Sequence, residues 1–104
     1  MSFKHAQKDV DEWTSQFKVQ YWQPFENLGH ITEEVGEIAR EINHLFGPKK
    51  KKPSEQNHEL GEEIADTIFA LICLANSQKI DLDTSCKKMM DKCYKRDINR
   101  FEKK

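Results

Sequence analysis

The stretch GEEIADTIFALICLAN, from Gly61 to Asn76, decides the fold. It contains eight consecutive apolar residues, Ile68 to Ala75. A run of this length predicts a helix segment that is buried on all sides. Glu63 and Asp66 lie where the run begins, and their apolar neighbours leave Asp66 in particular little room for solvation. An ionised carboxylate is costly in an apolar core unless another group pairs with it, so the rest of the chain must supply that partner.

The apolar periodicity of the whole chain predicts an all-α bundle of about four helices. Strand-like alternation does not persist anywhere, and we expect helices over about 3–17, 24–46, 58–78 and 82–100. Pro24 suits a first helical turn, Gly47-Pro48 stops the second helix, and Asp81 is the expected cap of the fourth. The second and third helices should lie antiparallel. The second helix carries a heptad seam for packing against neighbouring helices, formed by Leu28, Ile31, Val35, Ile38, Ile42 and Leu45.

The 104 residues predict one domain, 1–104, with a core small enough that self-association would help. No apolar run reaches the roughly 18 residues that span a membrane, and no leader resembles a signal peptide, so we expect a soluble cytoplasmic protein. The three cysteines lack CxxC spacing and are expected to be small buried hydrophobes rather than a disulfide framework: Cys73, Cys86 and Cys93.

Two stripes of acidic residues occur on the helices that are expected to be antiparallel. Residues three and four apart share one face of a helix, which aligns His30, Glu34, Glu37 and Glu41 on the second helix and Glu59, Glu63 and Asp66 on the third. Adjacent helices would then bring four carboxylates together: Glu34, Glu37, Glu63 and Asp66. Their repulsion would be relieved by a hard divalent cation, Mg²⁺ or Mn²⁺, because oxygen ligands suit these ions; solvated surface acids are the plainer interpretation.

Basic and aromatic residues supply the other half of a possible site. Lys88, Lys92, Arg96 and Arg100 recur every four residues, and such a stripe facing the acidic site would hold a polyphosphate; a solvated face is the alternative. Tyr21 and Trp22 precede the acidic helix, where they serve either core packing or stacking on a nucleobase. The run Lys49 to Lys52 is expected to be a solvated turn, and a lid that touches an anionic ligand is the alternative. The basic stripe is too short, in an otherwise acidic chain, to favour nucleic-acid binding.

The sequences EEVGE, Glu33 to Glu37, and EIAD, Glu63 to Asp66, resemble the EExxE…ExxD signature of MazG-type nucleoside triphosphate pyrophosphohydrolases. The resemblance covers roughly Tyr21 to Phe101. It implies an all-α fold that assembles as a homodimer or as a dimer of dimers. It also implies hydrolysis of (deoxy)nucleoside triphosphates to the monophosphate and pyrophosphate, for control of nucleotide pools or removal of abnormal nucleotides.

By motif position, the resemblance assigns Mg²⁺ to Glu34, Glu37, Glu63 and Asp66, and gives Glu33 a supporting catalytic role. It implies phosphate contacts for Lys92, Arg96 and Arg100, and a substrate contact for Asn76. One residue departs from the pattern, because Thr67 stands where an aliphatic residue is expected, which puts the surroundings of the ligands in doubt.

Two other interpretations remain open from the residues alone. A di-iron carboxylate bundle is a rival because Glu-x-x-His occurs twice, at Glu41/His44 and at Glu55/His58. A non-catalytic helical assembly module would explain the heptad seam, but it leaves Asp66 unexplained.

Overall fold

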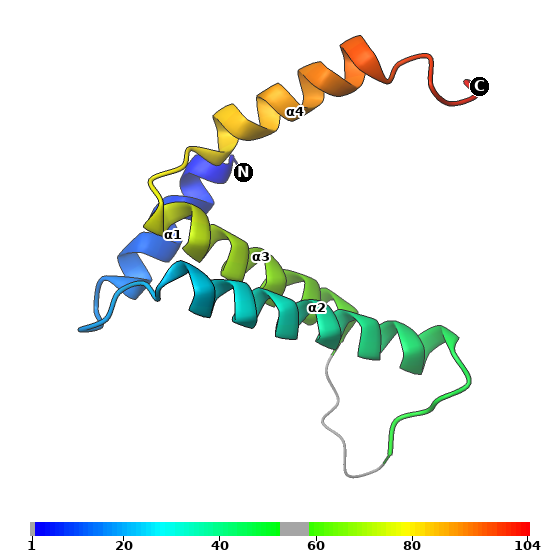
Figure 1. Ribbon diagram of the computed structural model, residues 1–104. Helices are drawn as coiled ribbons and strands as arrows, with labels where there is room; N and C mark the ends of the chain where they lie inside the picture. The colour runs from blue at the N-terminus through cyan, green and yellow to red at the C-terminus, as the bar shows by residue number, and fades with distance from the viewer. Residues whose placement is uncertain (1, 53–58) are drawn as a thin grey trace.

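The computed structural model describes residues 2–52 and 59–104 and confirms the all-α prediction. Its helices are α1 (Phe3–Thr14), α2 (Pro24–Phe46), α3 (Leu60–Ser77) and α4 (Leu82–Arg96) (Figure 1). Strands are absent from the described part of the chain. Helices α1 and α4 end three and four residues earlier than expected, and the expected start of α3 near residue 58 lies outside the described residues. None of the described helices is long and apolar enough to cross a membrane.

The helix starts follow the local chemistry of the sequence. Pro24 occupies the first turn of α2, and the backbone N–H of Gln23 donates to the Glu26 carboxylate at 3.0 Å. Asp81 caps α4 as predicted, because its Oδ1 accepts from the backbone N–H of Asp83 at 3.0 Å. The Thr84 hydroxyl, which donates to the Asp81 carboxylate, holds the pKa of that carboxyl below its usual range.

The carboxylate of Asp83 ties the beginning of α4 to the beginning of α1. It accepts from the backbone N–H groups of Phe3 and Lys4, both at 3.0 Å, and so satisfies two of the donors that a helix start leaves free. Beyond this junction α4 runs away from the other helices (Figure 1), and none of its residues is buried.

Helices α2 and α3 form an antiparallel hairpin, as predicted, and α1 crosses the end of α3 (Figure 1). The buried apolar side chains among the described residues are few and mostly small: Ala70, Ile72 and Ala75. The other buried residues are polar or charged: Thr14, Asn27, Glu41, His44, Glu63 and Thr67. The protomer therefore holds an unusually polar interior along its hairpin.

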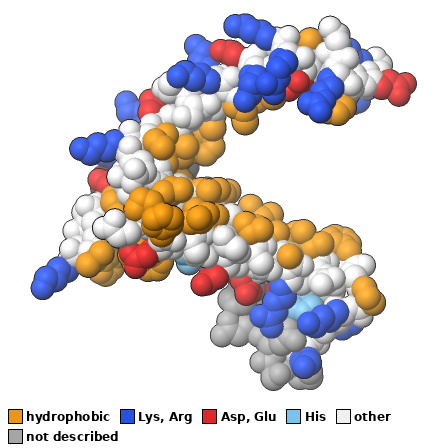
Figure 2. Space-filling model, viewed as in Figure 1, with side chains coloured by type: hydrophobic (Ala, Val, Ile, Leu, Met, Phe, Trp, Pro, Cys, Tyr) orange, Lys and Arg blue, Asp and Glu red, His pale blue; other side chains and the backbone are white. Residues whose placement is uncertain are grey.

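The prediction that the run in α3 is buried on all sides is wrong for this chain, since Ile68, Phe69 and Leu71 are exposed. The heptad seam of α2 is also largely uncovered, with Leu28, Val35, Ile42 and Leu45 exposed. The physical reason is that α4 does not fold back, so the hairpin has no further helix on its apolar side. Figure 2 shows hydrophobic side chains along the side of the hairpin that faces the hollow below α4.

The cysteine prediction is likewise only partly right. All three thiols are free, as expected, but Cys73 and Cys86 are half-buried and Cys93 is exposed. Burial raises the pKa of the Cys73 thiol. Cys86 and Cys93 lie on α4, none of whose residues is fully buried.

Candidate active site

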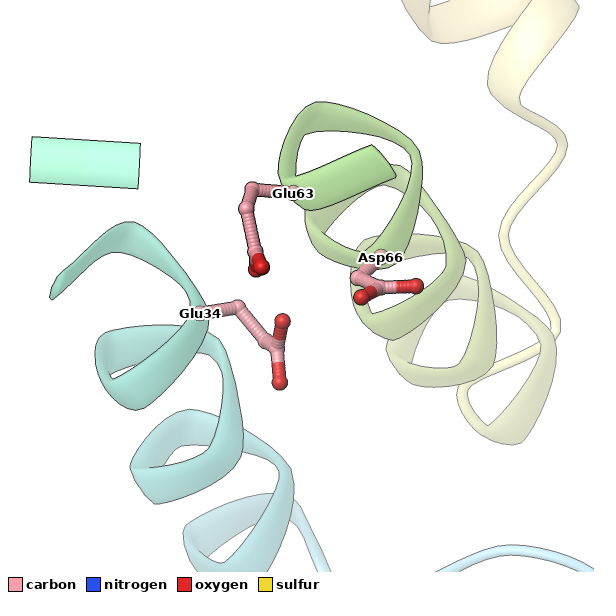
Figure 3. Close-up of side chains that lie close together, drawn as sticks. All are labelled: Glu34, Glu63 and Asp66. Carbon is pink, nitrogen blue, oxygen red and sulfur yellow. The ribbon is translucent and has the colours of Figure 1, made fainter. Parts of the chain in front are cut away.

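Three acidic side chains meet between α2 and α3 (Figure 3). Glu34 comes from α2, and Glu63 and Asp66 come from one face of α3, since they are three residues apart. One carboxylate oxygen from each lies within 4.8 Å of the others. Within residues 2–52 and 59–104, no other group of three His, Cys, Asp or Glu side chains comes together in this way.

The three carboxylates differ in their exposure to solvent. Glu63 is 4% exposed, the Glu34 side chain is 17% exposed, and Asp66 is exposed. The expectation that Asp66 has little room for solvation is therefore wrong, because its apolar neighbours Ile64 and Ile68 are themselves at the surface. Burial falls on Glu63 instead, and the cluster is closed at Glu63 and open at Asp66.

The remaining predicted acids lie outside this cluster. Glu37 is half-buried, and its Oε2 lies 3.8 Å from the Arg40 guanidinium. Glu33 is exposed. Glu41 is buried and pairs with Lys51, whose Nζ lies 3.0 Å from Oε1. Lys51 is thus held by an ion pair, whereas the sequence predicted a solvated turn of lysines.

The donor set fits a small divalent cation. At a metal–oxygen distance of about 2.1 Å, two Mg²⁺ ligands on opposite sides lie about 4.2 Å apart, so small side-chain rotations would close the 4.8 Å cluster around the ion. The three side chains offer only carboxylate oxygens, which suit Mg²⁺ or Mn²⁺ better than zinc. The di-iron alternative gains no support, because the Glu41 carboxylate pairs with Lys51. Its second pair, Glu55 and His58, lies outside the described residues.

Thr67, which departs from the family pattern, supports the cluster from inside α3. Its side chain is buried, and its hydroxyl donates to the backbone carbonyl of Glu63 at 2.9 Å. A buried hydroxyl needs such a partner, and this one lies within its own helix. The buried hydroxyl of Thr67 therefore has its hydrogen-bond partner within α3.

An aromatic cavity of about 280 Å³ lies at the α1 end of the hairpin. Five aromatic side chains line it: Trp13, Phe17, Tyr21, Trp22 and Phe69. The half-buried His30 and the buried Asn27 contribute polar groups to its wall. This composition, a mostly apolar wall with a few polar groups, is typical of small-molecule sites.

His30 connects the cavity to the carboxylate cluster. Its ring packs edge-on to Trp22 with centroids 5.4 Å apart, and its Nδ1 lies 3.9 Å from Oε1 of Glu34. The cavity and the cluster are therefore separated by a single side chain. A molecule with an aromatic group in the cavity would extend past His30 and reach the carboxylate cluster with its other end.

Hydrogen bonds fix the wall of the cavity around Tyr21. Its hydroxyl donates to Asp11 Oδ1 at 2.6 Å and accepts from Asn76 Nδ2 at 3.0 Å. Burial, followed by the bond to Asp11, raises the pKa of Tyr21 above its ordinary value. Asn76 also donates to the carbonyl of Gln7 and accepts from the Gln7 amide, each at 2.9 Å. The structure thus engages Asn76 within the protein, where it orients Tyr21.

The predicted basic residues do not meet the acids within one chain. Lys92 and Arg96 lie on α4, which projects away from the hairpin, and Arg100 follows the end of that helix (Figure 1). Arg96 and Arg100 both approach Asp97 Oδ1, at 3.4 and 3.8 Å. The facing arrangement of basic stripe and acidic site expected from the sequence is absent from the described part of this protomer.

The sequence assigned only Tyr21 and Trp22 of the cavity wall to a site, and the ring-bearing side chains that it missed are Trp13, Phe17, His30 and Phe69. Trp13 and Phe17 lie four residues apart on one face of the expected first helix, and this apolar spacing by itself predicts core packing. The available signal was position, since Phe69 lies three residues after Asp66 and His30 lies four residues before Glu34, both at the spacing of one helix face.

Comparison with known proteins places this all-α chain in a class. Residues 23–101 match the model of the MazG nucleotide pyrophosphohydrolase domain. The chain therefore belongs to the MazG family, whose members are hydrolases that act on phosphoric anhydride bonds of nucleotides, as the motif resemblance implied. The matched range contains the three clustered carboxylates and the whole of α4.

The particular relatives are small proteins of similar length. YpjD of Bacillus subtilis (strain 168) is 42% identical over 103 residues, which is 99% of this chain and 93% of YpjD. A crystal structure of YpjD matches with a TM-score of 0.79 and covers 88% of this chain and 94% of that one. A crystal structure of the Bacillus-conserved MazG protein, a nucleotide pyrophosphohydrolase, is 39% identical with a TM-score of 0.79, covering 96% and 97%.

Proposed function

We propose that the carboxylate cluster is the Mg²⁺-dependent centre at which this protein hydrolyses nucleoside or deoxynucleoside triphosphates to the monophosphate and pyrophosphate. The observation that carries the proposal is the approach of three carboxylates from two helices, one of them buried, at the two halves of the family's acidic signature. The family assignment supports the reaction class, since its members hydrolyse nucleotides at a phosphoric anhydride bond.

In the proposed reaction, the oxygen of a water molecule attacks the α-phosphorus. The bond from that phosphorus to the bridging oxygen breaks, and pyrophosphate leaves with the electron pair of the bond. A cation bound at the site would neutralise phosphate charge and acidify a coordinated water; Mn²⁺ would be able to replace Mg²⁺. Glu34, Glu63 and Asp66 would hold it, with Glu37 joining them after turning from Arg40. Glu33 would orient the attacking water or accept its proton.

The aromatic cavity is the proposed site of the nucleobase. Tyr21 and Trp22 were predicted to be candidates for stacking, and both line it together with Trp13 and Phe69. Stacking on an aromatic side chain contributes about 1–3 kcal/mol per base and tolerates different bases. His30 spans the short path from the cavity to Glu34, so a base in the cavity would direct its phosphates towards the cluster.

We assign the phosphates to Lys92, Arg96 and Arg100, because a developing negative charge on the leaving group is stabilised by positioned cations. Since α4 lies away from the cluster of its own chain, these residues would reach the cluster of a second copy in the homodimer or dimer of dimers that the family resemblance implies. Asn76 would act through Tyr21 rather than by touching the substrate, since its amide is engaged by Gln7 and by the Tyr21 hydroxyl. A cytoplasmic location and a role in nucleotide-pool control or removal of abnormal nucleotides complete the proposal.

The test is pyrophosphate release by the purified protein across a panel of ribo- and deoxyribonucleoside triphosphates, with and without Mg²⁺. We expect release that requires the ion. Glu63→Gln and Asp66→Asn should each lower the rate by roughly a hundredfold or more, because each removes a ligand charge from the reacting centre. The thermal midpoint of each variant should stay at or above that of wild type, since acid–acid repulsion is relieved.

The matched control is Asp9→Asn, an exposed carboxylate on α1 outside the cluster, which should leave the rate unchanged. If wild type released pyrophosphate from no nucleotide, the non-catalytic assembly module would become the better interpretation. If the cluster variants kept their activity, the proposed ion site would be wrong even though the enzyme assignment survived.

A further inference from the structure

A chain of hydrogen bonds runs from the first residue of α4 to the wall of the aromatic cavity. The side-chain amide of Gln7, on α1, lies in its middle. Its Oε1 accepts from the backbone N–H of Leu82 at 3.1 Å, and its Nε2 donates to Asn76 Oδ1 at 2.9 Å. Asn76 Nδ2 donates in turn to the hydroxyl of Tyr21, which lines the cavity, at 3.0 Å. Two half-buried amides therefore connect the start of α4 with the proposed base site.

The pair formed by Gln7 and Asn76 fixes the orientation of both amides. Besides the bond between the side chains, Asn76 Nδ2 donates to the backbone carbonyl of Gln7 at 2.9 Å. Reversing either amide would bring two donors or two acceptors face to face, so each oxygen and each nitrogen has one role. Neither amide turns without breaking bonds at both of its ends.

Asp11 fixes the far end of this chain of bonds. Its Oδ1 accepts from the Tyr21 hydroxyl at 2.6 Å and from Gln20 Nε2 at 3.0 Å. Because the single hydroxyl proton of Tyr21 is used in the bond to Asp11, the hydroxyl oxygen is left to accept from Asn76. The position of the Tyr21 ring therefore depends on the amides as well as on Asp11.

Gln7 also holds the turn between α3 and α4. Its Nε2 donates to the backbone carbonyl of Ile80 at 2.8 Å, two residues before the Leu82 N–H that its Oε1 accepts. Lys79, in the same turn, has a φ of 56°, a left-handed conformation that is unfavourable for a residue other than glycine. Such a residue keeps its conformation only where the surrounding structure holds it, and Gln7 provides two of the bonds that do so.

Few contacts attach α4 to the other helices (Figure 1). In the part of the chain that the structure describes, two side chains make hydrogen bonds between α4 and α1: Gln7 at the N–H of Leu82, and Asp83 at the first N–H groups of α1. Both bonds lie at the first turn of α4, and no residue of this helix is buried. A small change at that turn therefore changes the direction of the whole helix, which carries Lys92 and Arg96.

We propose that Gln7 is a positioning residue that couples the aromatic cavity to the direction of α4. The inference rests on the proposed function, in which the cavity holds the base. A base that packs on Tyr21 fixes its hydroxyl, the hydroxyl fixes Asn76, and Asn76 fixes the amide on which α4 begins. Base binding thus orders the helix that carries the cations. Because coupling between two equilibria is reciprocal, a change at the first turn of α4 also changes the affinity of the cavity.

Loss of the Leu82 N–H isolates the first link. Leu82→Pro removes this donor, and proline suits the first helical position because Asp81 before it is extended, with φ −87° and ψ 106°. The matched control is Leu82→Ala, which shortens the side chain and keeps the N–H. Leu82→Pro should raise KM for the triphosphate that wild type uses best by about threefold or more, whereas Leu82→Ala should keep the wild-type KM.

A double-mutant cycle with Tyr21→Phe separates coupling from a merely structural effect. Tyr21→Phe keeps the ring in the cavity and removes the hydroxyl that Asn76 contacts. In this background Leu82→Pro and Leu82→Ala should have the same KM, because the chain of bonds is already interrupted. A wild-type KM for Leu82→Pro would overturn the inference, and so would an effect of Leu82→Pro that persists undiminished in Tyr21→Phe.

Hydrogen exchange at the Leu82 amide gives a readout that does not depend on turnover. The probes are free ribo- and deoxyribonucleosides, which carry a base and no phosphate. At saturation, the nucleoside that fits the cavity should slow this exchange by about threefold or more in wild type and leave it unchanged in Tyr21→Phe. If no nucleoside slows it, the coupling is wrong, even in an active enzyme. A wild type that releases no pyrophosphate would instead contradict the proposed function, while slowing by a nucleoside would still support the coupling.

Discussion

The two sides of the α2–α3 hairpin follow the same heptad spacing and yet have opposite outcomes. Glu34 and Glu41, seven residues apart, are half-buried and buried, whereas Leu28, Val35 and Ile42 at the same spacing are exposed. In a self-contained protein the aliphatic residues would be inside and the carboxylates outside. The inversion shows that the polar side is closed within the chain and that the chain leaves the apolar side uncovered.

The difference between the two sides of the hairpin follows from the free energy that each kind of side chain costs when it has no partner. A buried carboxylate requires a partner at once, and Glu41 has one in Lys51 at 3.0 Å. An exposed valine or isoleucine, by contrast, needs no polar partner. Burying it against another surface stabilises that contact by about 25 cal/mol per Å² of apolar area. One side therefore fixes the protomer, and the other remains available for association.

The largest expected effect on the rate distinguishes an acid of α2 inside the cluster from an acid of α2 outside it. Glu34→Gln should lower pyrophosphate release by roughly a hundredfold or more, because Glu34 is the α2 residue whose carboxylate already lies in the cluster. Glu26→Gln, on the exposed first turn of the same helix, is the control and should keep the rate. The measurement is initial rate at saturating Mg²⁺ together with the oligomeric state. An unchanged rate for Glu34→Gln would remove α2 from the site.

A second substitution tests the apolar side one residue further on. Val35→Glu places a charge on the exposed apolar side of α2, where a second copy would pack in the homodimer that the family resemblance implies. We therefore expect dissociation in sedimentation velocity and a rate lower by about tenfold or more at dilute protein. Asn43→Glu adds the same charge at an exposed position near the end of α2, outside the apolar seam, and should change neither quantity. A Val35→Glu protein that stays associated would show that the apolar side is not the contact.

The smallest expected effect concerns the aromatic cavity. Phe69→Ala should raise KM by about tenfold with little change in kcat, because loss of one stacking or packing contact in a base site removes about 1.4 kcal/mol of binding. Phe25→Ala is the matched control, since Phe25 is 88% exposed and does not line the cavity. A fall in kcat with unchanged KM would place Phe69 in support of the cluster rather than of the base.

The sequence predicted the helices well because their signals are local. Pro24, the Gly47-Pro48 stop and the Asp81 cap act through neighbouring backbone groups, and each helix begins or ends near its signal. The antiparallel hairpin followed from a connection of ordinary length between the two helices. The meeting of Glu34 with Glu63 and Asp66 also followed, since helix periodicity fixes the face on which each side chain lies.

The position of α4 and the burial pattern were not predictable in the same way. The burial of the run from Ile68 onward depends on how many helices surround it, which no local pattern encodes. Asp66 is exposed for that reason, although its sequence neighbours are apolar. Glu37 turned towards Arg40 because the i, i+3 spacing that aligns acids also aligns an acid with a base.

The few buried apolar residues, Ala70, Ile72 and Ala75, have a consequence for the order of events after synthesis. Two alanines and one isoleucine remove little apolar area from water, so apolar burial contributes little to the stability of the tertiary structure in a single chain. If a second copy supplies the missing burial, the chain completes its fold only when it meets another. Completing the fold is then a bimolecular reaction, and the fraction of native protein depends on how much of it the cell has made.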